Sequence, residues 1–110
     1  MSNFTASANT AVGSSALEYN TIGEYNTAIG LKSLQNNFTG ISNTAVGSYT
    51  SSGNFNASII LGRDATATAS NQFVSGSVAY PAGAVSVAAA AQTRTWDVII
   101  NGVAHKILLA

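Results

Sequence analysis

The sequence predicts an all-β protein, built as a short β-solenoid (a β-roll) with coils of about 14–17 residues and a C-terminal β-hairpin. Two observations support this prediction: a five-residue phrase that returns at a fixed spacing, and two apolar runs joined by Asn-Gly near the C-terminus. Glycines recur too densely for the apolar positions to keep the helical period of about 3.6 residues. We therefore divide the chain into a repeat region (1–77), an Ala/Gly-rich junction (78–92) and a C-terminal hairpin (93–110).

The repeated phrase is Asn-Thr-Ala-Val-Gly, which starts at Asn9 and returns at Asn26 (with Ile for Val) and at Asn43, with the same 17-residue step each time. Ser-Ile-Ile-Leu-Gly at 58–62 comes after a shorter step, and the step from Gly62 to Gly76 is shorter again. Each phrase is rich in β-branched residues and ends in a glycine that can turn with positive φ, so it predicts one short strand and one corner. The repeat positions are Asn9, Gly13, Asn26, Gly30, Asn43, Gly47 and Gly62.

The other half of each coil also repeats. Similar hexads begin at Asn3, Asn20, Asn37 and Asn54, so we expect the 17-residue register to run from residue 3 to about residue 58. Coils stacked about 4.8 Å apart place equivalent residues in columns. Asparagine side chains in such columns can bond to one another as hydrogen-bonded ladders.

We assign the apolar positions of the strand phrase to two columns according to the size of their side chains. We expect an apolar spine inside the stack, formed by Val12, Ile29, Val46 and Leu61. We expect small residues to leave room where chains or coils approach closely, namely Ala11, Ala28 and Ala45.

The C-terminal hairpin is predicted from Asn101-Gly102, because a type I′ turn needs positive φ at both central residues. A two-residue loop pairs Ile100 with Val103, Val98 with His105, Asp97 with Lys106 and Trp96 with Ile107. Because both faces of this hairpin are apolar, we expect it to cap the solenoid and pack against other copies as a clasp. The clasp residues are Trp96, Val98, Ile100, Asn101, Gly102, Ile107 and Leu109.

Charge and composition exclude several kinds of partner. Charged residues make up 7% of the chain, with zero net charge, against roughly 25% in an ordinary domain. A chain this poorly charged is expected to bury much of its surface against copies of itself. Its few scattered cations argue against nucleic-acid binding, and no apolar run approaches the ~20 residues of a membrane helix, so we expect no membrane insertion.

The residues that bear chemistry are few. The chain has no cysteine and one histidine, His105, which alone makes a poor metal ligand, so we expect no metal and no cofactor. Glu18 and Glu24 are the one close acidic pair, of the kind a glycosidase uses, but they fall in different columns of one coil. We therefore expect no enzymatic activity.

The aromatic residues give two alternatives. The candidate surface-binding residues Tyr19, Tyr25 and Tyr49, together with the phenylalanines at 4, 38 and 55, could form an exposed stripe that binds sugars. The favoured alternative is that the phenylalanines stack in the core and the tyrosines cover an interface.

The repeats resemble a known group of proteins. Asn-Thr-Ala-Val-Gly-x-x-Ala-Leu at 9–17, and its copy at 26–34, resemble the repeats of phage tail fibres and related bacterial surface proteins. Residues 58–77 resemble the coils of trimeric autotransporter adhesin heads, and 95–110 is similar to the C-termini of some short phage fibre and virion proteins. Because these families form β-rolls as homotrimers, the resemblance implies that this chain is homotrimeric.

The same resemblance implies a function. It indicates a non-enzymatic structural protein of a phage virion, made in the host cytoplasm and exposed on the particle as a surface fibre or fibre tip. Its implied partners are other copies, other tail or capsid proteins, and a host cell-surface glycan. A capsid decoration (cement) protein that stabilises the shell is the alternative, and a tailspike that degrades polysaccharide is a remote one.

Overall fold

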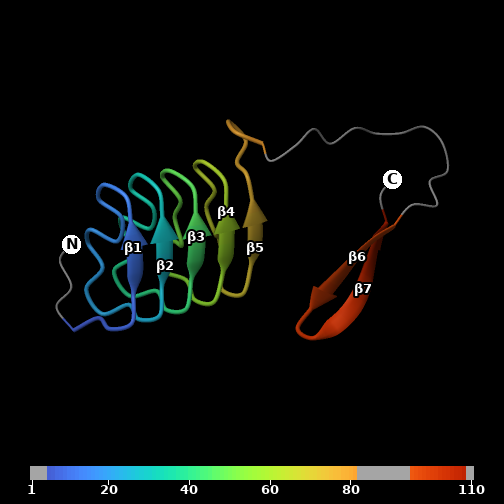
Figure 1. Cartoon of the computed structure of the whole chain (residues 1–110), viewed down its shortest axis with the longest axis horizontal. Helices are drawn as coiled ribbons and strands as arrows, with labels where there is room; N and C mark the ends of the chain where they lie inside the picture. The colour runs from blue at the N-terminus through green and yellow to red at the C-terminus, as the bar shows by residue number, and fades with distance from the viewer. Residues whose placement is uncertain (1–4, 82–94, 109–110) are drawn as a thin grey trace.

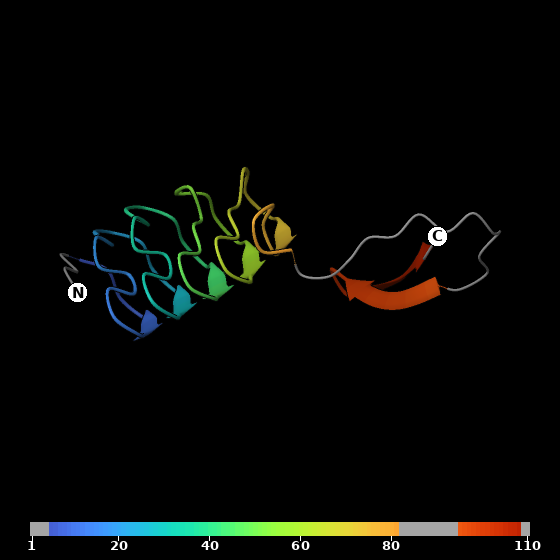
Figure 2. The ribbon, with the colours of Figure 1, turned by 90° about the horizontal axis from the view of Figure 1, so that it is seen from above.

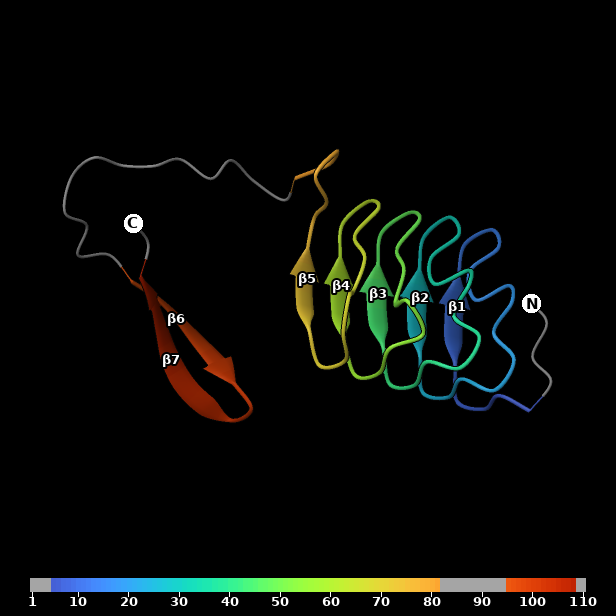
Figure 3. The ribbon, with the colours of Figure 1, turned by 180° about the vertical axis from the view of Figure 1, so that it is seen from behind.

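The computed structural model describes residues 5–81 and 95–108. Five short strands form one parallel sheet in chain order (Figure 1), namely β1 (Thr10–Val12), β2 (Thr27–Ile29), β3 (Thr44–Val46), β4 (Ile59–Leu61) and β5 (Phe73–Ser75). The chain returns to each new strand through a loop, which makes a β-solenoid of about four turns (Figure 3). Seen from above, the strands lie along one side of the stack and the loops along the other (Figure 2).

The register of the sheet confirms the predicted repeat lengths. Thr10 pairs with Thr27 and Thr27 with Thr44, so the first two coils keep the 17-residue step. Thr44 pairs with Ile59, a 15-residue step, and Ile59 pairs with Phe73, a 14-residue step. We number the coils by their strands: coil 1 is 9–25, coil 2 is 26–42, coil 3 is 43–57 and coil 4 is 58–71.

The interior of the stack is lined by the middle residue of each strand. Ala28, Ala45 and Ile60 are completely buried, whereas the predicted spine is wrong: Val12 is 56% exposed, and its column faces outward. A three-residue strand can place either its middle residue or its two outer residues inside. The choice of the small residue is explained by what lies opposite.

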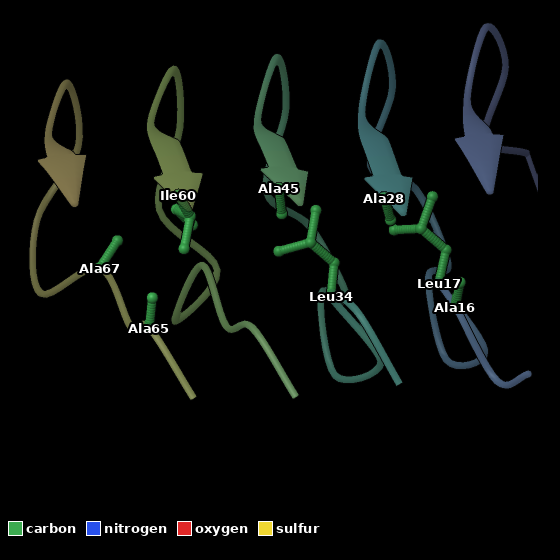
Figure 4. Close-up of a cluster of buried hydrophobic side chains, with 8 residues drawn as sticks. All are labelled: Ala16, Leu17, Ala28, Leu34, Ala45, Ile60, Ala65 and Ala67. Atoms are coloured by element: carbon green, nitrogen blue, oxygen red, sulfur yellow. The ribbon is translucent and has the colours of Figure 1, made fainter. Parts of the chain in front are cut away.

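Large and small side chains face each other across the interior. Leu17 and Leu34, from the loops of coils 1 and 2, point toward Ala28 and Ala45 on the strands (Figure 4). In coil 4 the arrangement is reversed, because the strand supplies the large Ile60 and the loop supplies small residues, Ala65 and Ala67 (Figure 4). In each case a large side chain faces a small one, as expected of a close-packed interior.

The coil becomes shorter at one corner, between coils 2 and 3. In coil 2 residues 34–36 separate Ser33 from Asn37, whereas in coil 3 Ser51 alone separates Thr50 from Ser52. Two side-chain bonds fix this equivalence: the hydroxyls of Ser33 and Thr50 are 2.8 Å apart, and Ser52 donates to Asn37 Oδ1 at 2.6 Å. The register expected to extend to about residue 58 therefore changes near residue 51.

The predicted hairpin is present at the C-terminus. Strands β6 (Thr95–Ile100) and β7 (Val103–Leu108) pair in antiparallel fashion with every predicted cross-strand pair, including Ile100 with Val103 and Trp96 with Ile107. Asn101 (φ 52°) and Gly102 (φ 77°) both take the positive φ that a type I′ turn needs. Leu109 lies outside the described residues. Within the part of the chain described, β6 and β7 pair only with each other.

A small turn follows β5. Gly76 and Pro81 form an antiparallel bridge, and Ser77 N–H donates to Tyr80 O at 3.0 Å. The ring of Tyr80 lies 4.2 Å from the Arg63 guanidinium, which ties this turn to coil 4. The predicted junction at 78–92 thus begins with an ordered turn, and from 82 onward it lies outside the described residues.

Candidate functional site

The asparagines of the repeated phrase form a ladder that joins each coil to the next. Oδ1 of Asn9 accepts a hydrogen bond from the backbone N–H of Asn26 at 2.8 Å, and Asn26 does the same for Asn43 at 3.0 Å. Asn43 Oδ1 accepts from Ser58 N–H at 3.0 Å, and Ser58 Oγ accepts from Gln72 N–H at 3.3 Å. The ladder was predicted, but its side chains bond to the backbone of the next coil and not to one another.

The amide nitrogens of the same asparagines bind the end of their own coil. Nδ2 of Asn9, Asn26 and Asn43 donates at 2.8 Å to the carbonyls of Gly23, Gly40 and Phe55 respectively. Each acceptor lies shortly before the next residue of the ladder along the chain. Asn26 and Asn43 are fully buried with both ends of the side chain bonded, as a buried amide requires.

A second column of polar side chains runs through the loop side of the stack. Asn37 Nδ2 donates to Asn20 Oδ1 at 3.1 Å and to Gly40 O at 2.8 Å, and Asn37 Oδ1 accepts from Ser52. Asn54 was expected in this column and is not there, because Ser52 takes the place. Asn54 is exposed instead, and its Oδ1 accepts from Phe38 N–H at 2.6 Å.

The repeated glycines form a column in which there is no space for a side chain. Gly13, Gly30, Gly47 and Gly62 have φ between 106° and 145°, which confirms the predicted positive φ. A Cβ atom added to Gly30 would lie 2.5 Å from the carbonyl oxygen of Gly47 in the next coil, and Gly13 and Gly47 are crowded in the same way. The glycines therefore serve both the turn and the close stacking of backbones.

The outward face of the sheet carries apolar side chains without a partner in the described chain. Val12 is 56% exposed, Ile29 40% and Val46 41%, and they form one column along the stack. Beside it, the Thr column of β1–β3 continues as Ile59 and Phe73, which are also exposed. We did not predict this face from the sequence. The signal for it was the pair of large leucines, Leu17 and Leu34, because they leave room for only the small Ala of each Thr-Ala-Val strand to face inward.

The tyrosines are exposed, as both alternatives require, but they do not form one stripe. Tyr25 precedes β2 and Tyr49 follows β3, each at a corner with positive φ (57° and 59°), so they lie at opposite ends of the strands. Tyr19 belongs to the loop of coil 1, where its N–H donates to Gln35 O at 3.0 Å. The hypothesis of a single aromatic binding stripe is therefore wrong.

The phenylalanines are not core residues. Phe38 and Phe55 are exposed, so the expectation that they stack in the interior is wrong. Phe4 lies outside the described residues. The interior is filled by Leu17, Leu34 and Ile60 instead.

The two glutamates bond in opposite directions along the stack. Glu18 accepts a hydrogen bond from Gln35 in coil 2, whereas Glu24 accepts from Ser7 Oγ at 3.1 Å. The Gln35 bond, followed by one from Ser15, lowers the pKa of the Glu18 carboxyl below its ordinary value of 4.5. A lowered pKa favours the carboxylate, which is the wrong form for a general acid.

Metal-binding groups do not gather in the described part of the chain. Among the residues whose side chains the structure describes, no three of His, Cys, Asp or Glu are placed to hold an ion. Position 105, the one histidine, pairs with Val98 across the hairpin. Among the same residues there is no helix of the length and apolarity needed to cross a membrane.

Comparison with known proteins gives no relative. No family model, curated protein or solved structure matches this chain. The site is therefore defined by the geometry alone: a stack of coils, two internal polar ladders and an apolar outer face on the sheet side.

Proposed function

We propose that this chain is a non-enzymatic structural protein of a phage virion, which assembles as a homotrimer and forms a surface fibre or fibre tip. The observation that carries the proposal is the exposed apolar column Val12–Ile29–Val46 on the outer face of the sheet. Exposed apolar side chains that form a continuous patch mark a surface that associates. The repeat phrases, which resemble those of phage fibres, set the context.

The occupant of this face is a further copy of the same chain. The column repeats once per coil along the stack, at about 4.8 Å, so a partner with the same period can match it side chain by side chain along its whole length. A second solenoid of this sequence carries that period. The low content of charged side chains, 7% of the chain, also leaves little electrostatic repulsion between copies.

Three copies around an axis parallel to the stack would close this surface. In that arrangement each outer face meets both neighbours, and no apolar column is left at an open edge. The β6–β7 hairpin of each copy then acts as the predicted clasp between copies. A trimeric shaft with ladders along its axis suits a mechanical role on the particle, and the tyrosines at its corners are available to contact a host glycan.

The first experiment measures the mass of the full chain in solution by analytical ultracentrifugation. We expect a trimer, and a monomer at all concentrations would overturn the proposal. Ile29→Lys is expected to dissociate the trimer because it buries a charge in the interface. The matched control is Ile41→Lys, since Ile41 is 42% exposed but precedes β3 at a corner away from the sheet face, and it should leave the trimer intact.

The second experiment locates the protein on intact particles with an antibody against the folded chain and electron microscopy. Label on the tail supports the fibre. Label at threefold positions of the capsid would replace the fibre with the decoration protein, and no label on particles would overturn the virion assignment.

A further inference from the structure

The tip of the β6–β7 hairpin is chemically unlike the rest of the molecule. Asn101-Gly102 is the one Asn-Gly pair among the eleven asparagines of the sequence. Both residues are exposed and stand outside the strand pairing, which ends at Ile100 and Val103. A Cβ atom added to Gly102 would meet nothing within 4 Å, so open space surrounds its backbone.

We propose that Asn101 is a site of spontaneous deamidation, which converts it to aspartate and isoaspartate and opens the turn of the hairpin. The reacting groups are the side-chain amide of Asn101 and the backbone nitrogen of Gly102, with water from the solvent as the second reactant. The modification itself does not depend on the proposed function. Its effect on a trimer would rest on the clasp role proposed above.

The chemistry follows from the absence of a side chain on Gly102. The Gly102 nitrogen loses its proton and attacks Asn101 Cγ, the new C–N bond closes a five-membered succinimide, and the Cγ–Nδ2 bond breaks to release ammonia. Water then opens the ring. Attack at Cγ gives aspartate, and attack at the backbone carbonyl carbon of Asn101 gives isoaspartate, with the chain running through the former side chain.

The ladder asparagines are held away from this reaction. Asn9, Asn26 and Asn43 are each followed by threonine, whose Cβ crowds the attacking nitrogen. The nitrogens in question are also engaged, since the N–H groups of Thr10 and Thr27 donate to the next coil at 2.8 Å. In all three side chains Oδ1 accepts a backbone hydrogen bond and Nδ2 donates one to a backbone carbonyl. The structure thus protects the ladder asparagines. Asn36, Asn54, Asn56 and Asn71 are exposed but each is followed by a residue with a side chain, so among the described residues only Asn101 is exposed and followed by glycine.

Isoaspartate would disrupt the turn more than aspartate would. Isoaspartate adds one carbon to the backbone, so residue 101 no longer has the φ and ψ angles of an α-amino acid. The two-residue loop can then no longer hold Ile100 opposite Val103. Aspartate adds a charge, but the resulting Asp-Gly sequence is also one that type I′ turns accept. The loss of hairpin pairing should therefore follow the isoaspartate fraction.

The experiment incubates the full-length protein at neutral and mildly alkaline pH and maps each asparagine by peptide mass spectrometry, with electron-based fragmentation to identify isoaspartate. We expect modification at Asn101, faster at the higher pH, at a rate several-fold above that of any asparagine in residues 5–81. The same chain in denaturant serves as the reference for the unprotected rate.

Two variants separate the causes. Asn101→Gly keeps a Gly-Gly sequence that type I′ turns accept but carries no amide, so the modification at this position should vanish and the hairpin should persist. Asn101→Asp gives the charge alone and should retain hairpin pairing when fresh, as judged by NMR cross-strand contacts. The proposal is overturned if folded protein shows no conversion at 101 while the denatured chain does, or if conversion is spread over the ladder asparagines.

Discussion

The side-chain oxygen of Asn26 lies 3.0 Å from the backbone nitrogen of Asn43 and accepts its hydrogen. This bond links two coils at a point where neither residue is accessible to solvent. Water cannot replace a buried hydrogen bond, so its loss should be costly.

Asn26→Ala is expected to lower the free energy of unfolding by about 2–4 kcal/mol, because it leaves the Asn43 N–H buried without an acceptor and removes packed atoms. The carbonyl of Gly40 loses less, since Asn37 Nδ2 still donates to it. Denaturant unfolding followed by circular dichroism, at one protein concentration, measures the loss.

The control for this variant is Asn56→Ala. Asn56 Oδ1 also accepts a backbone hydrogen bond, from Ile41 N–H at 2.9 Å, but Asn56 is exposed. Water can take its place, so we expect a cost below about 1 kcal/mol. Equal costs for the two variants would contradict the importance of burial in the ladder.

Gly30→Ala should destabilise the stack by about 3 kcal/mol or more, because the new Cβ collides with backbone and the residue keeps a strained φ. The collision is with Gly47 O at 2.5 Å, which no side-chain rotation relieves. Gly53→Ala is the matched control. Other residues of this chain adopt a φ near its 59°, and a Cβ added there would meet the ring of Phe55 at 3.1 Å and the carbonyl oxygen of Ala67 at 3.2 Å, which is less crowded than at Gly30. We expect Gly53→Ala to cost about 1–2 kcal/mol, the ordinary cost of a left-handed conformation for alanine, and melting temperatures rank the pair.

Leu34→Ala should cost about 2–5 kcal/mol, as expected for a buried leucine whose site cannot collapse. Leu34 is 1% exposed, and it fills the space opposite Ala45 (Figure 4). Leu31→Ala removes the same atoms from a side chain that is 42% exposed, so its cost should stay near or below about 1 kcal/mol. A similar loss for both leucines would mean that the interior is not where the structure places it.

Gln35→Leu should raise the pKa of Glu18 toward its ordinary value of 4.5, because the Gln35 bond is the first cause of the lowered value. The folded-state pKa is lowered, so this bond stabilises the protein above about pH 4.5 and the stabilisation is lost as the pH falls through the folded-state value. NMR titration of the Glu18 carboxyl carbon measures the shift.

The control is Gln72→Leu. The side chain of Gln72 donates to Thr68 Oγ1 and accepts from the backbone N–H groups of Thr68 and Ala69, far along the chain from Glu18. It should therefore leave the Glu18 titration unchanged. If it moves the Glu18 pKa as much as Gln35→Leu does, the cause is a general loosening of the stack.

The parts of the fold that the sequence predicts well are those set by spacing. The regular recurrence of Asn9, Asn26 and Asn43 follows from the need for equivalent residues to stack, and it fixes the pairing of β1 with β2 and of β2 with β3. The hairpin register is equally determined, because Asn101-Gly102 leaves one way to pair Ile100 and Val103.

The inside and outside of the sheet could not be chosen from the strand phrase alone. Hydrophobicity favours Ile29 inside over Ala28, but the space available is decided by Leu17, which faces Ala28 and belongs to a different column. The change of register near Ser51 was not predicted, for a related reason. Asn54 continues the sequence spacing, whereas Ser52 continues the hydrogen bonds.

The exchange of large and small residues across the interior gives the stack a direction. A duplicated coil inserted between coils 1 and 2 would find an alanine strand and a leucine loop on both sides, as its parent does. The same unit inserted after coil 4 would stack against Ile60, whose loop carries alanines and has lost the longer corner. A copy of coil 1 or coil 2 therefore fits beside its parent but not beside coil 4, so the order of the coils decides which kind of unit can be added at each place in the stack.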